Sequence, residues 1–503
     1  MKQLSCIATC FLAASFFAIA AGTNGRLVDA VKNSDKISTR ELLEKHADAN
    51  LPDVDGTTAL HWAARTDDLE TVELLIRGGA NVKTANRYGV TPLSLACVNG
   101  SALMIEALLK AGSDPNTVLP GGETALMTAA RTGKLDAVNA LLAHSAQVNA
   151  KESGHDQTAL MWAAAEGHTP VVDALIESGA DIHARSTAGF TPLLFAVREG
   201  RIEVVKSLLK AGVDVNETWH GYKKAPKYAF RPAGKEQTGP SALILAVANA
   251  HYELASVLLD AGADPNLAPQ GWTALHEITW VRKPGTGSNN PAPHGSGNMD
   301  GLELVKRMAA KGANLNAQMT EKGDAGYTDI NMIGASPFLM AARTADAPLM
   351  RLLAQLGADP LLPNADNSTP IIIAAGLGSK SPGEDPGTES EVLEAVKLAI
   401  ELGGDINAAD SNGETPMHGA AYKAVPLVAQ FLIDKGAKME IWNKANKSGW
   451  TPLRISEGVY LEGNLRGISP AVSAMLRKVM TEAGVSTALG SAERSGPTRR
   501  ADQ

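Results

Sequence analysis

Apolar and polar positions along the chain repeat in a fixed pattern about every 33 residues. The segment T-A-L-H-W-A-A at 58–64 returns as T-P-L-S-L-A-C at 91–97. Segments of the same kind begin at Thr58, Thr91, Thr124, Thr158, Thr191, Ser241, Thr273, Ser336, Thr369, Thr415 and Thr451. The first four spacings are 33, 33, 34 and 33 residues. A constant period of this length indicates a repeat protein, in which each unit packs on its neighbours.

Each repeat predicts two short helices followed by a turn. The leading Thr or Ser is a good helix N-cap, and the Leu and Ala positions after it form a narrow apolar stripe. A second apolar stretch follows, for example at 72–75 and 204–209. A glycine then recurs at Gly79, Gly112, Gly179, Gly212, Gly262, Gly312, Gly357, Gly403 and Gly436, and Ser145 takes its place in the third copy. We expect this position to end the second helix in a left-handed conformation.

These motifs resemble the ankyrin repeat. The pattern T-P-L-H-x-A-A is nearly complete at 58–64 and 415–421, and G-A-D-x-N is complete at 262–266. The resemblance implies an all-α ankyrin-repeat solenoid of helix pairs with β-hairpin fingers. We expect about twelve repeats over residues 21–484. They include a degenerate first one at 26–51, where Ser38 and Glu41 predict a capping box.

Deviations from the period predict insertions, all of them after residue 212. They lie near 217–240, 282–299, 318–334, 377–390 and 459–468. The resemblance implies that turns between repeats project as fingers along the concave binding side, and that loops inside a repeat lie on the opposite edge. Residues 485–503 are small and polar, which predicts a disordered tail.

The first twenty residues predict a secretory signal peptide. Lys2 precedes an apolar run over 6–20 that ends in A-I-A, so we expect cleavage near Ala20/Ala21 and a periplasmic or secreted protein. No later segment is apolar enough over about 20 residues to predict a membrane span. Cys97 is then the only cysteine of the processed chain, and its place in the Ala pair predicts a buried, inert thiol.

Composition agrees with close-packed small helices. Hydrophobic residues make up 44% of the 503 residues but aromatic residues only 4%. The net charge of −8 argues against a general nucleic-acid binder, which needs clustered Lys and Arg.

The insertion 217–240 is rich in aromatic and basic residues, although the chain as a whole is poor in aromatic residues and acidic. Its aromatic residues are Trp219, Tyr222, Tyr228 and Phe230, and its basic residues include Lys223, Lys224 and Arg231. Aromatic and basic side chains together suit a contact with a protein, an acidic polymer or stacked bases. The alternative is that the aromatic side chains fold the long loop back onto its neighbours.

Two further sets of residues suggest a binding surface. Phe190, Trp272 and Trp450 each precede a capping Thr and are either anchors for a partner or packing against the next finger. Arg65, Arg131, Arg198 and Arg343 each follow the Ala pair, and either line the concave face or solvate the end of the first helix.

The sequence contains no zinc, haem, phosphate-loop or hydrolase motif, so we expect no catalysis, no cofactor and no metal. The resemblance is to bacterial exported ankyrin-repeat proteins. It implies a monomeric scaffold that binds a protein partner through the concave face and the fingers. The alternative is a binder of an anionic envelope polymer through the finger at 217–240.

Overall fold

The computed structural model describes residues 27–119, 121–222, 236–284, 293–321, 330–379, 385–461, 464–466 and 468–488. The expected signal peptide and most of the expected disordered tail lie outside these residues. The described chain is mostly helical and forms two compact units. The first unit extends to Asp214 and includes 219–237, and the second contains 215–218 and the chain from Thr238 onward.

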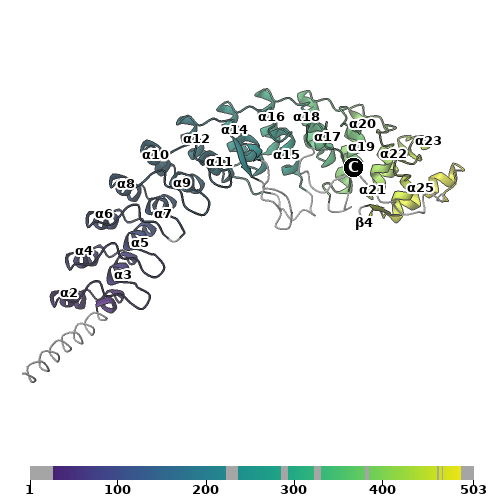
Figure 1. Cartoon of the computed structure of the whole chain (residues 1–503). Coiled ribbons are helices and arrows are strands. Elements are labelled where there is room, and N and C mark those ends of the chain that lie inside the picture. Colours follow the sequence, from purple (N-terminus) through teal and green to yellow (C-terminus); the bar gives the residue numbers. More distant parts are fainter. Residues whose placement is uncertain are drawn as a thin grey trace, which may run out of the picture. The chain divides into compact units, whose positions relative to one another are not determined.

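Helix pairs build the first unit (Figure 1). A helix over 27–32 pairs with α2 (Lys36–Glu44). The following pairs are α3 (Ala59–Arg65) with α4 (Leu69–Arg77), α5 (Pro92–Asn99) with α6 (Ala102–Lys110), α7 (Ala125–Thr132) with α8 (Leu135–Ala143), α9 (Ala159–Glu166) with α10 (Thr169–Glu177), and α11 (Pro192–Arg198) with α12 (Ile202–Lys210). First helices contact neighbouring first helices, and second helices contact second helices. Each pair is therefore held by its nearest neighbours, as the period predicts.

The second unit repeats this arrangement. Its pairs are α13 (Ala242–Ala248) with α14 (Tyr252–Asp260), α15 (Ala274–Arg282) with α16 (Gly301–Ala310), α17 (Pro337–Arg343) with α18 (Ala347–Leu356), α19 (Pro370–Ala374) with α20 (Glu389–Glu401), α21 (Pro416–Tyr422) with α22 (Pro426–Asp434), and α24 (Pro452–Ser456) with α25 (Pro470–Glu482). A one-turn helix, α23 (Met439–Trp442), lies between α22 and α24. The first helices α13, α15, α17, α19, α21 and α24 again pack one on the next.

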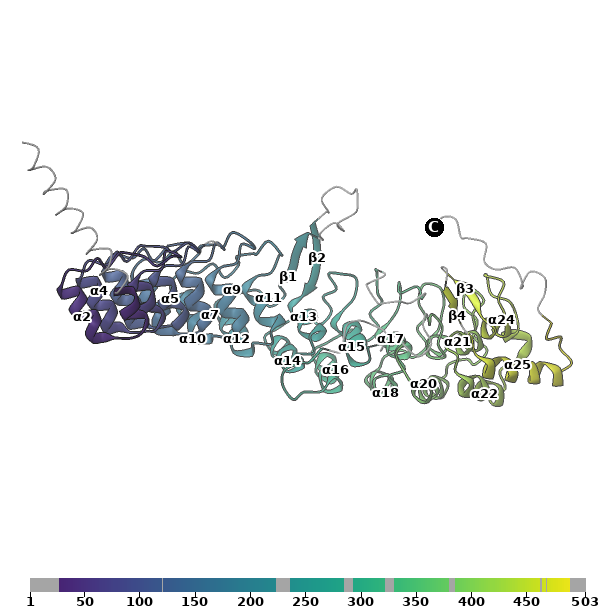
Figure 2. The ribbon, with the colours of Figure 1, turned by 90° about the horizontal axis from the view of Figure 1, so that it is seen from below.

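The turns between repeats form fewer strands than the expected hairpin fingers. In the described ranges, the turns between repeats contain β1 (Thr218–Tyr222) with β2 (Glu236–Ser241) and one isolated bridge between Val118 and Thr124. A second strand pair, β3 (Val459–Leu461) with β4 (Asn464–Arg466), lies inside a repeat, between α24 and α25. Other turns are closed by local hydrogen bonds such as Asn86 N to Val90 O at 3.0 Å. In Figure 2 the turns of the first unit all project from the same side of the helices.

Capping residues begin the first helices where the sequence predicts them. The Thr91 hydroxyl accepts a hydrogen bond from Ser94 N at 3.2 Å, and Thr191 accepts one from Leu194 N at 3.3 Å. The predicted capping box of Ser38 and Glu41 is wrong, because α2 begins earlier, at Lys36. Asp35 is its N-cap and accepts from Ser38 N at 3.0 Å. A carboxylate is as good a cap as a serine hydroxyl, so the earlier residue takes the place.

Second helices end in the left-handed conformation predicted for the recurring glycine. Gly79 has a φ of 85°, and Ser145, which replaces the glycine in the third copy, has a φ of 64°. His46 lies 33 residues before Gly79 and has a φ of 56°. The left-handed turn is therefore a property of the repeat, and it is kept even where a side chain makes it less favourable.

Three buried histidines tie one repeat to the next. In the repeat of His276, the Thr273 hydroxyl lies 2.9 Å from His276 Nδ1, and Nε2 lies 3.1 Å from the carbonyl oxygen of Ala335. His61 and His418 make the same contacts with Thr58 and Thr415 and with the carbonyls of Val90 and Trp450. These are the repeats in which the histidine of the pattern is present.

Asparagine side chains link consecutive turns on the exposed surface. Asn149 Nδ2 donates to Gly179 O at 3.0 Å, and its Oδ1 accepts from Asp181 N at 2.7 Å. Asn50 and Asn266 bridge the following turn in the same way. Each such side chain satisfies one carbonyl and one amide of the next repeat, at the end of a second helix where backbone groups lack helical partners.

We expect Asn149→Ala to lower the free energy of unfolding by about 1 kcal/mol, because two hydrogen bonds between turns are lost while the freed backbone groups stay accessible to water. Urea unfolding of the full chain measures this. Asn139→Ala, on the exposed face of α8, is the matched control and should change stability by less than about 0.5 kcal/mol. Equal effects of the two changes would contradict the role of the asparagine bridge.

Small apolar residues fill the core between helices. Ala63, Ala96, Ala129 and Ala163 are fully buried at the same place in successive first helices. Cys97 is buried beside them, and burial raises the pKa of its thiol to about 12. The prediction of an inert core thiol is confirmed, because the reactive species is the thiolate.

Candidate partner-binding surface

One face of each first helix is defined by two positions of the repeat. Its residues are the fourth and seventh after the capping Thr or Ser, which lie on the same side of a helix because they are three apart. We call this the first-helix face. In the first unit the fourth positions are Trp62, Leu95, Thr128, Trp162 and Phe195, and the seventh are Arg65, Val98, Arg131, Ala165 and Arg198. The seventh positions contain three of the four arginines that the sequence suggests.

Two tryptophans of this face carry stacked cations. The Arg65 guanidinium lies 5.5 Å from the ring centroid of Trp62, and the Lys32 ammonium lies 4.9 Å from the same ring. Arg131 extends to the following repeat, where its guanidinium lies 5.1 Å from the ring centroid of Trp162. The interpretation that these arginines only solvate a helix end is therefore too simple for Arg65 and Arg131, since both are held against an aromatic ring.

Both tryptophans are partly buried, and the indole nitrogen of each is covered. Among the described residues neither Trp62 Nε1 nor Trp162 Nε1 has a hydrogen-bond partner. A buried N–H without a partner costs free energy, and tryptophan side chains usually satisfy it. Trp280 Nε1 in the second unit is covered in the same way.

Phe190 lies against the same face. Its ring centroid is 5.4 Å from that of Phe195, and the Arg198 guanidinium lies 5.1 Å from both rings. Arg198 also pairs with Glu199 at 2.8 Å. Phe190 and Trp162 pack on a small buried cluster of Met161, Ala184 and Phe195. Phe190 thus makes intramolecular contacts while remaining only partly buried.

The insertion at 217–240 is described only at its base. The Trp219 indole N–H donates to the carbonyl of Ala188 at 2.7 Å. Gly189 has a φ of 84°, and a Cβ there would collide with the backbone of His220, so a glycine is needed for this close approach. Tyr222 ends β1. The other suggested contact residues, Lys223, Lys224, Tyr228, Phe230 and Arg231, lie outside the described residues.

In the second unit, a carboxyl group is bound to one of two tryptophans that contact each other. The Trp272 indole N–H donates to Glu277 Oε2 at 2.9 Å, and the Trp272 and Trp280 rings meet edge to face at 5.9 Å. Both rings pack against a buried cluster that includes Met319, Met332 and Met340. Burial in these apolar surroundings raises the pKa of Glu277 to about 7.

A second buried carboxyl group lies near Trp450. Glu414 Oε1 accepts from Asn446 Nδ2 at 2.7 Å and from the Tyr422 hydroxyl at 3.3 Å. Burial is the main reason that its pKa is raised to about 7. Trp450 is partly buried, and its carbonyl meets His418 at 3.3 Å. Its backbone is therefore part of the bracing between repeats.

Arg343 differs from the other three arginines. It is partly buried in a small cavity that Asp385 and Lys423 also line. Burial lowers the pKa of Arg343, and the nearby charge of Asp385 opposes that change. The insertion that supplies Asp385 therefore takes Arg343 into internal packing, away from the exposed helix end that the sequence suggests.

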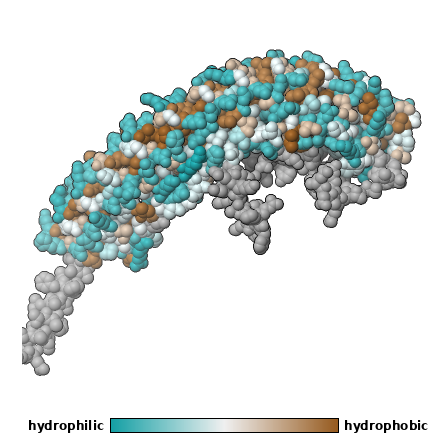
Figure 3. Space-filling view, turned by 45° about the horizontal axis from the view of Figure 1, so that its top comes forward, coloured by the Kyte–Doolittle hydropathy of each residue, from teal (hydrophilic) through white to brown (hydrophobic). Residues whose placement is uncertain are grey.

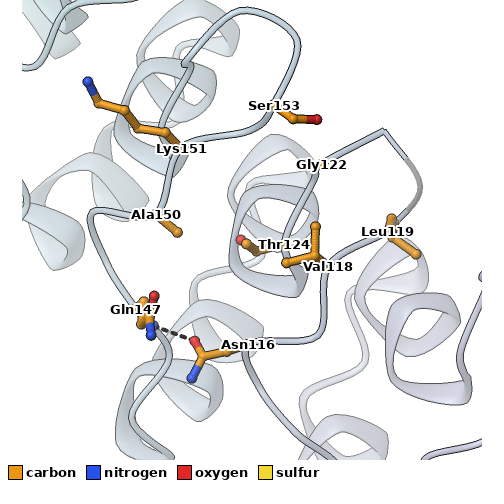
Figure 4. Close-up of a pocket in the computed structure, with 9 residues that line it drawn as sticks. All are labelled: Asn116, Val118, Leu119, Gly122, Thr124, Gln147, Ala150, Lys151 and Ser153. Atoms are coloured by element: carbon orange, nitrogen blue, oxygen red, sulfur yellow. Dashed lines mark hydrogen bonds between the residues drawn. The ribbon is translucent and has the colours of Figure 1, made fainter.

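An open pocket lies between two consecutive turns of the first unit (Figure 4). Val118 and Leu119 line it from one turn and Lys151 and Ser153 from the next, while the hydrogen bond from Gln147 N to Asn116 Oδ1 crosses one end. Lys151 is the one ionisable side chain among the described residues that line it. The pocket thus lacks the paired groups that acid–base chemistry needs.

The opposite side of the molecule offers a different surface. Figure 3 views the second helices, where small apolar patches are separated by polar ones. Leu103 on the second helix α6 is an exposed apolar side chain. No cluster of metal-ligating side chains was found in the part of the chain that the structure describes. In the same residues no helix is both long and apolar enough to cross a membrane.

The helix pairs, the left-handed turns and the bracing histidines together define a repeat protein. Ankyrin-repeat family models match residues 27–118, 104–186 and 153–218, and a single-repeat model matches 238–268. Ankyrin repeats are therefore shown over these stretches of the chain. Ankyrin repeats in general act as scaffolds for protein interactions, and nothing in the matches points to catalysis.

Curated relatives share only short stretches with this chain. Neurogenic locus notch homolog protein 1 of Homo sapiens is 41% identical over 56 residues, which are 11% of this chain and 2% of that protein. An ankyrin repeat protein of fowlpox virus is 46% identical over 50 residues, 10% of this chain and 12% of that protein. An ankyrin repeat protein of Acanthamoeba polyphaga mimivirus is 37% identical over 68 residues, which are 14% of this chain and 9% of that protein. The chain thus spans a small part of each relative, and the likeness is one of repeats.

Sequence reasoning missed the aromatic residues of the first-helix face. Trp62, Trp162, Phe195 and Trp280 were not singled out, nor was Glu277. Their common signal is register, because each lies four or seven residues after a capping Thr. Counting from the cap would have brought them together with Arg65, Arg131 and Arg198.

Proposed function

We propose that the protein is a non-catalytic scaffold that binds a protein partner through the first-helix face and the turns that precede it. The observation that carries the proposal is the pair Trp62 and Trp162, two partly buried tryptophans in register, each with a basic side chain over its ring. Tryptophan and arginine are the residues that contribute most often to protein-binding hot spots. Because stacked repeats hold these side chains in place, little ordering is needed on binding.

We further propose that the scaffold is a monomer of about twelve ankyrin repeats over residues 21–484, exported to the periplasm or secreted. Support for export comes from the sequence of residues 1–20. Support for the repeat number comes from the helix pairs that follow the capping residues beyond the matched range, such as α21 with α22. Mass spectrometry of the mature chain would contradict export if the protein retained its first twenty residues.

The finger at 217–240 supports a second proposal, the binding of an anionic envelope polymer. Its basic residues Lys223, Lys224 and Arg231 lie outside the described residues, so the support is their sequence alone. Trp219, at its base, is already engaged with the carbonyl of Ala188. We therefore treat the first-helix face as the principal surface.

Affinity capture from the native exported fraction tests the scaffold function. We expect Trp62→Ala with Trp162→Ala to reduce the amount of captured partner at least tenfold, because two anchors of the surface are removed. Leu103→Ala with Leu427→Ala, two exposed leucines of other surfaces, is the matched control and should leave capture unchanged. Circular dichroism establishes that each variant is folded.

Two results would count against this function. Capture that survives loss of both tryptophans would exclude the first-helix face as the principal surface. Capture of a polymer in place of a protein, lost steeply as salt rises, would favour the finger.

A further inference from the structure

Three cations of the first unit lie on aromatic rings along the first-helix face. We call Lys32, Trp62, Arg65, Arg131 and Trp162 the cation–aromatic row. Trp62 has Lys32 at 4.9 Å and Arg65 at 5.5 Å from its ring centroid, and Arg131 is 5.1 Å from that of Trp162. A guanidinium that stacks on a ring keeps its N–H edge free to meet a planar acceptor. The row therefore holds its arginines in a fixed orientation.

The cations of the row are exposed and have no carboxylate partner among the described residues. Some other basic side chains of the same unit are paired with carboxylates. Lys36 lies 2.9 Å from Glu70, and Lys110 lies 3.1 Å from Glu106. Both of these lysines belong to second helices, α2 and α6.

The charge of the row is opposite to that of its surroundings. Residues 27–214 contain 24 Asp and Glu but 17 Lys and Arg, a difference of −7. Many of these acids lie on second helices, such as Glu70, Glu106, Asp136, Asp173 and Glu203. A basic row on an acidic unit attracts an acidic partner to one face and repels it from the other.

We propose that the cation–aromatic row binds an acidic segment of a partner protein, whose carboxylates meet Arg65 and Arg131 and whose apolar side chains contact Trp62 and Trp162. This inference rests on the proposed scaffold function and names the chemistry of the partner. An arginine binds a carboxylate through two parallel hydrogen bonds, which makes the contact both strong and directional.

The register of the row sets the spacing of those carboxylates. Arg65 and Arg131 hold the same place in repeats that are two apart. Because packed helices lie 8–10 Å apart, the two guanidinium groups are on the order of 16–20 Å from each other. An extended chain rises about 3.3 Å per residue, so the two acids are separated by about five or six residues.

A fluorescein-labelled peptide of twelve glutamates contains this spacing and serves as the probe. Fluorescence anisotropy with the full chain at low salt should show binding that weakens as salt is added. Arg65→Glu with Arg131→Glu should lower the affinity at least tenfold. The control is Lys110→Glu with Lys206→Glu, on α6 and α12, which changes the net charge by the same amount as the arginine variant. It should change the affinity less than twofold.

Several results would overturn the inference. One is that the peptide does not bind the unaltered chain. Another is that the two double variants lose the same amount of affinity for the peptide. A third is that the chain binds heparin tightly but does not bind the peptide. The last would identify an anionic polymer as the occupant. If the Arg65 and Arg131 variant still captures a protein partner that the Trp62 and Trp162 variant loses, the scaffold function stands and the acidic segment is wrong.

Discussion

Replacing His276 by alanine should lower the free energy of unfolding of the second unit by about 3 to 4 kcal/mol. The imidazole is fully buried and joins Thr273 of its own repeat to the carbonyl of Ala335 in the next. Alanine leaves a cavity together with buried polar groups that have lost their partner, and both effects are costly. Urea unfolding followed by circular dichroism measures the change.

Two further variants show which part of the loss is polar. His276→Leu keeps most of the volume and should cost about 1 to 2 kcal/mol, because only the hydrogen bonds are removed. The chain itself places Leu194 and Leu339 at this position in other repeats. His294→Ala, an exposed histidine of the same unit, is the control. A loss below 1 kcal/mol for His276→Ala would show that the bracing contributes little.

Replacing Glu277 by glutamine should stabilise the second unit at alkaline pH and not at acid pH. The pKa of Glu277 is raised to about 7, so the folded chain binds a proton that the unfolded chain releases near pH 4.5. The stability that this proton provides is complete below pH 4.5 and is lost as the pH rises through 7. Glutamine keeps an acceptor for the Trp272 N–H and has no charge to bury. The difference should therefore grow from near zero at pH 4.5 to roughly 2 to 3 kcal/mol at pH 8.

The comparison of variant with unaltered chain at each pH isolates this carboxyl group. Burial lowers the pKa of His276 and His418 to about 4. Their contribution to the free energy of unfolding therefore falls as the pH drops from 6.5 to 4, which is opposite in sign to the pH dependence from Glu277. Glu414→Gln should behave like Glu277→Gln, because its pKa is also raised to about 7. Glu303→Gln, on an exposed position of α16, is the control. A difference that does not vary with pH would show that Glu277 is ionised without cost.

The helix pairs could be predicted from sequence because each depends on residues close together in the chain. The Thr caps, the Ala pair and the left-handed turn at Ser145 are set within one repeat, and the structure places all of them as expected. The start of α2 shows the limit of such reasoning. Two acceptable caps lay three residues apart, and local pattern alone did not choose Asp35 over Ser38.

The candidate surface was harder to predict, because its contacts join different repeats. Arg131 stacks on Trp162, thirty-one positions later, and Glu277 acquires its environment from methionines beyond residue 318. Arg343 is turned inward by a residue of an insertion that breaks the period. The composition of each repeat contains no sign of these partners. Only the register of the fourth and seventh positions links them.

The nearest-neighbour packing of the helix pairs also bears on how such a chain can diverge. The stretch between α15 and α16 is longer than in a plain repeat, yet α15 still packs on α13 and α17, and α16 on α14 and α18. A lengthened loop therefore alters one point of the surface and leaves the neighbouring contacts intact. New recognition elements can be gained one repeat at a time, with the stacked framework inherited unchanged.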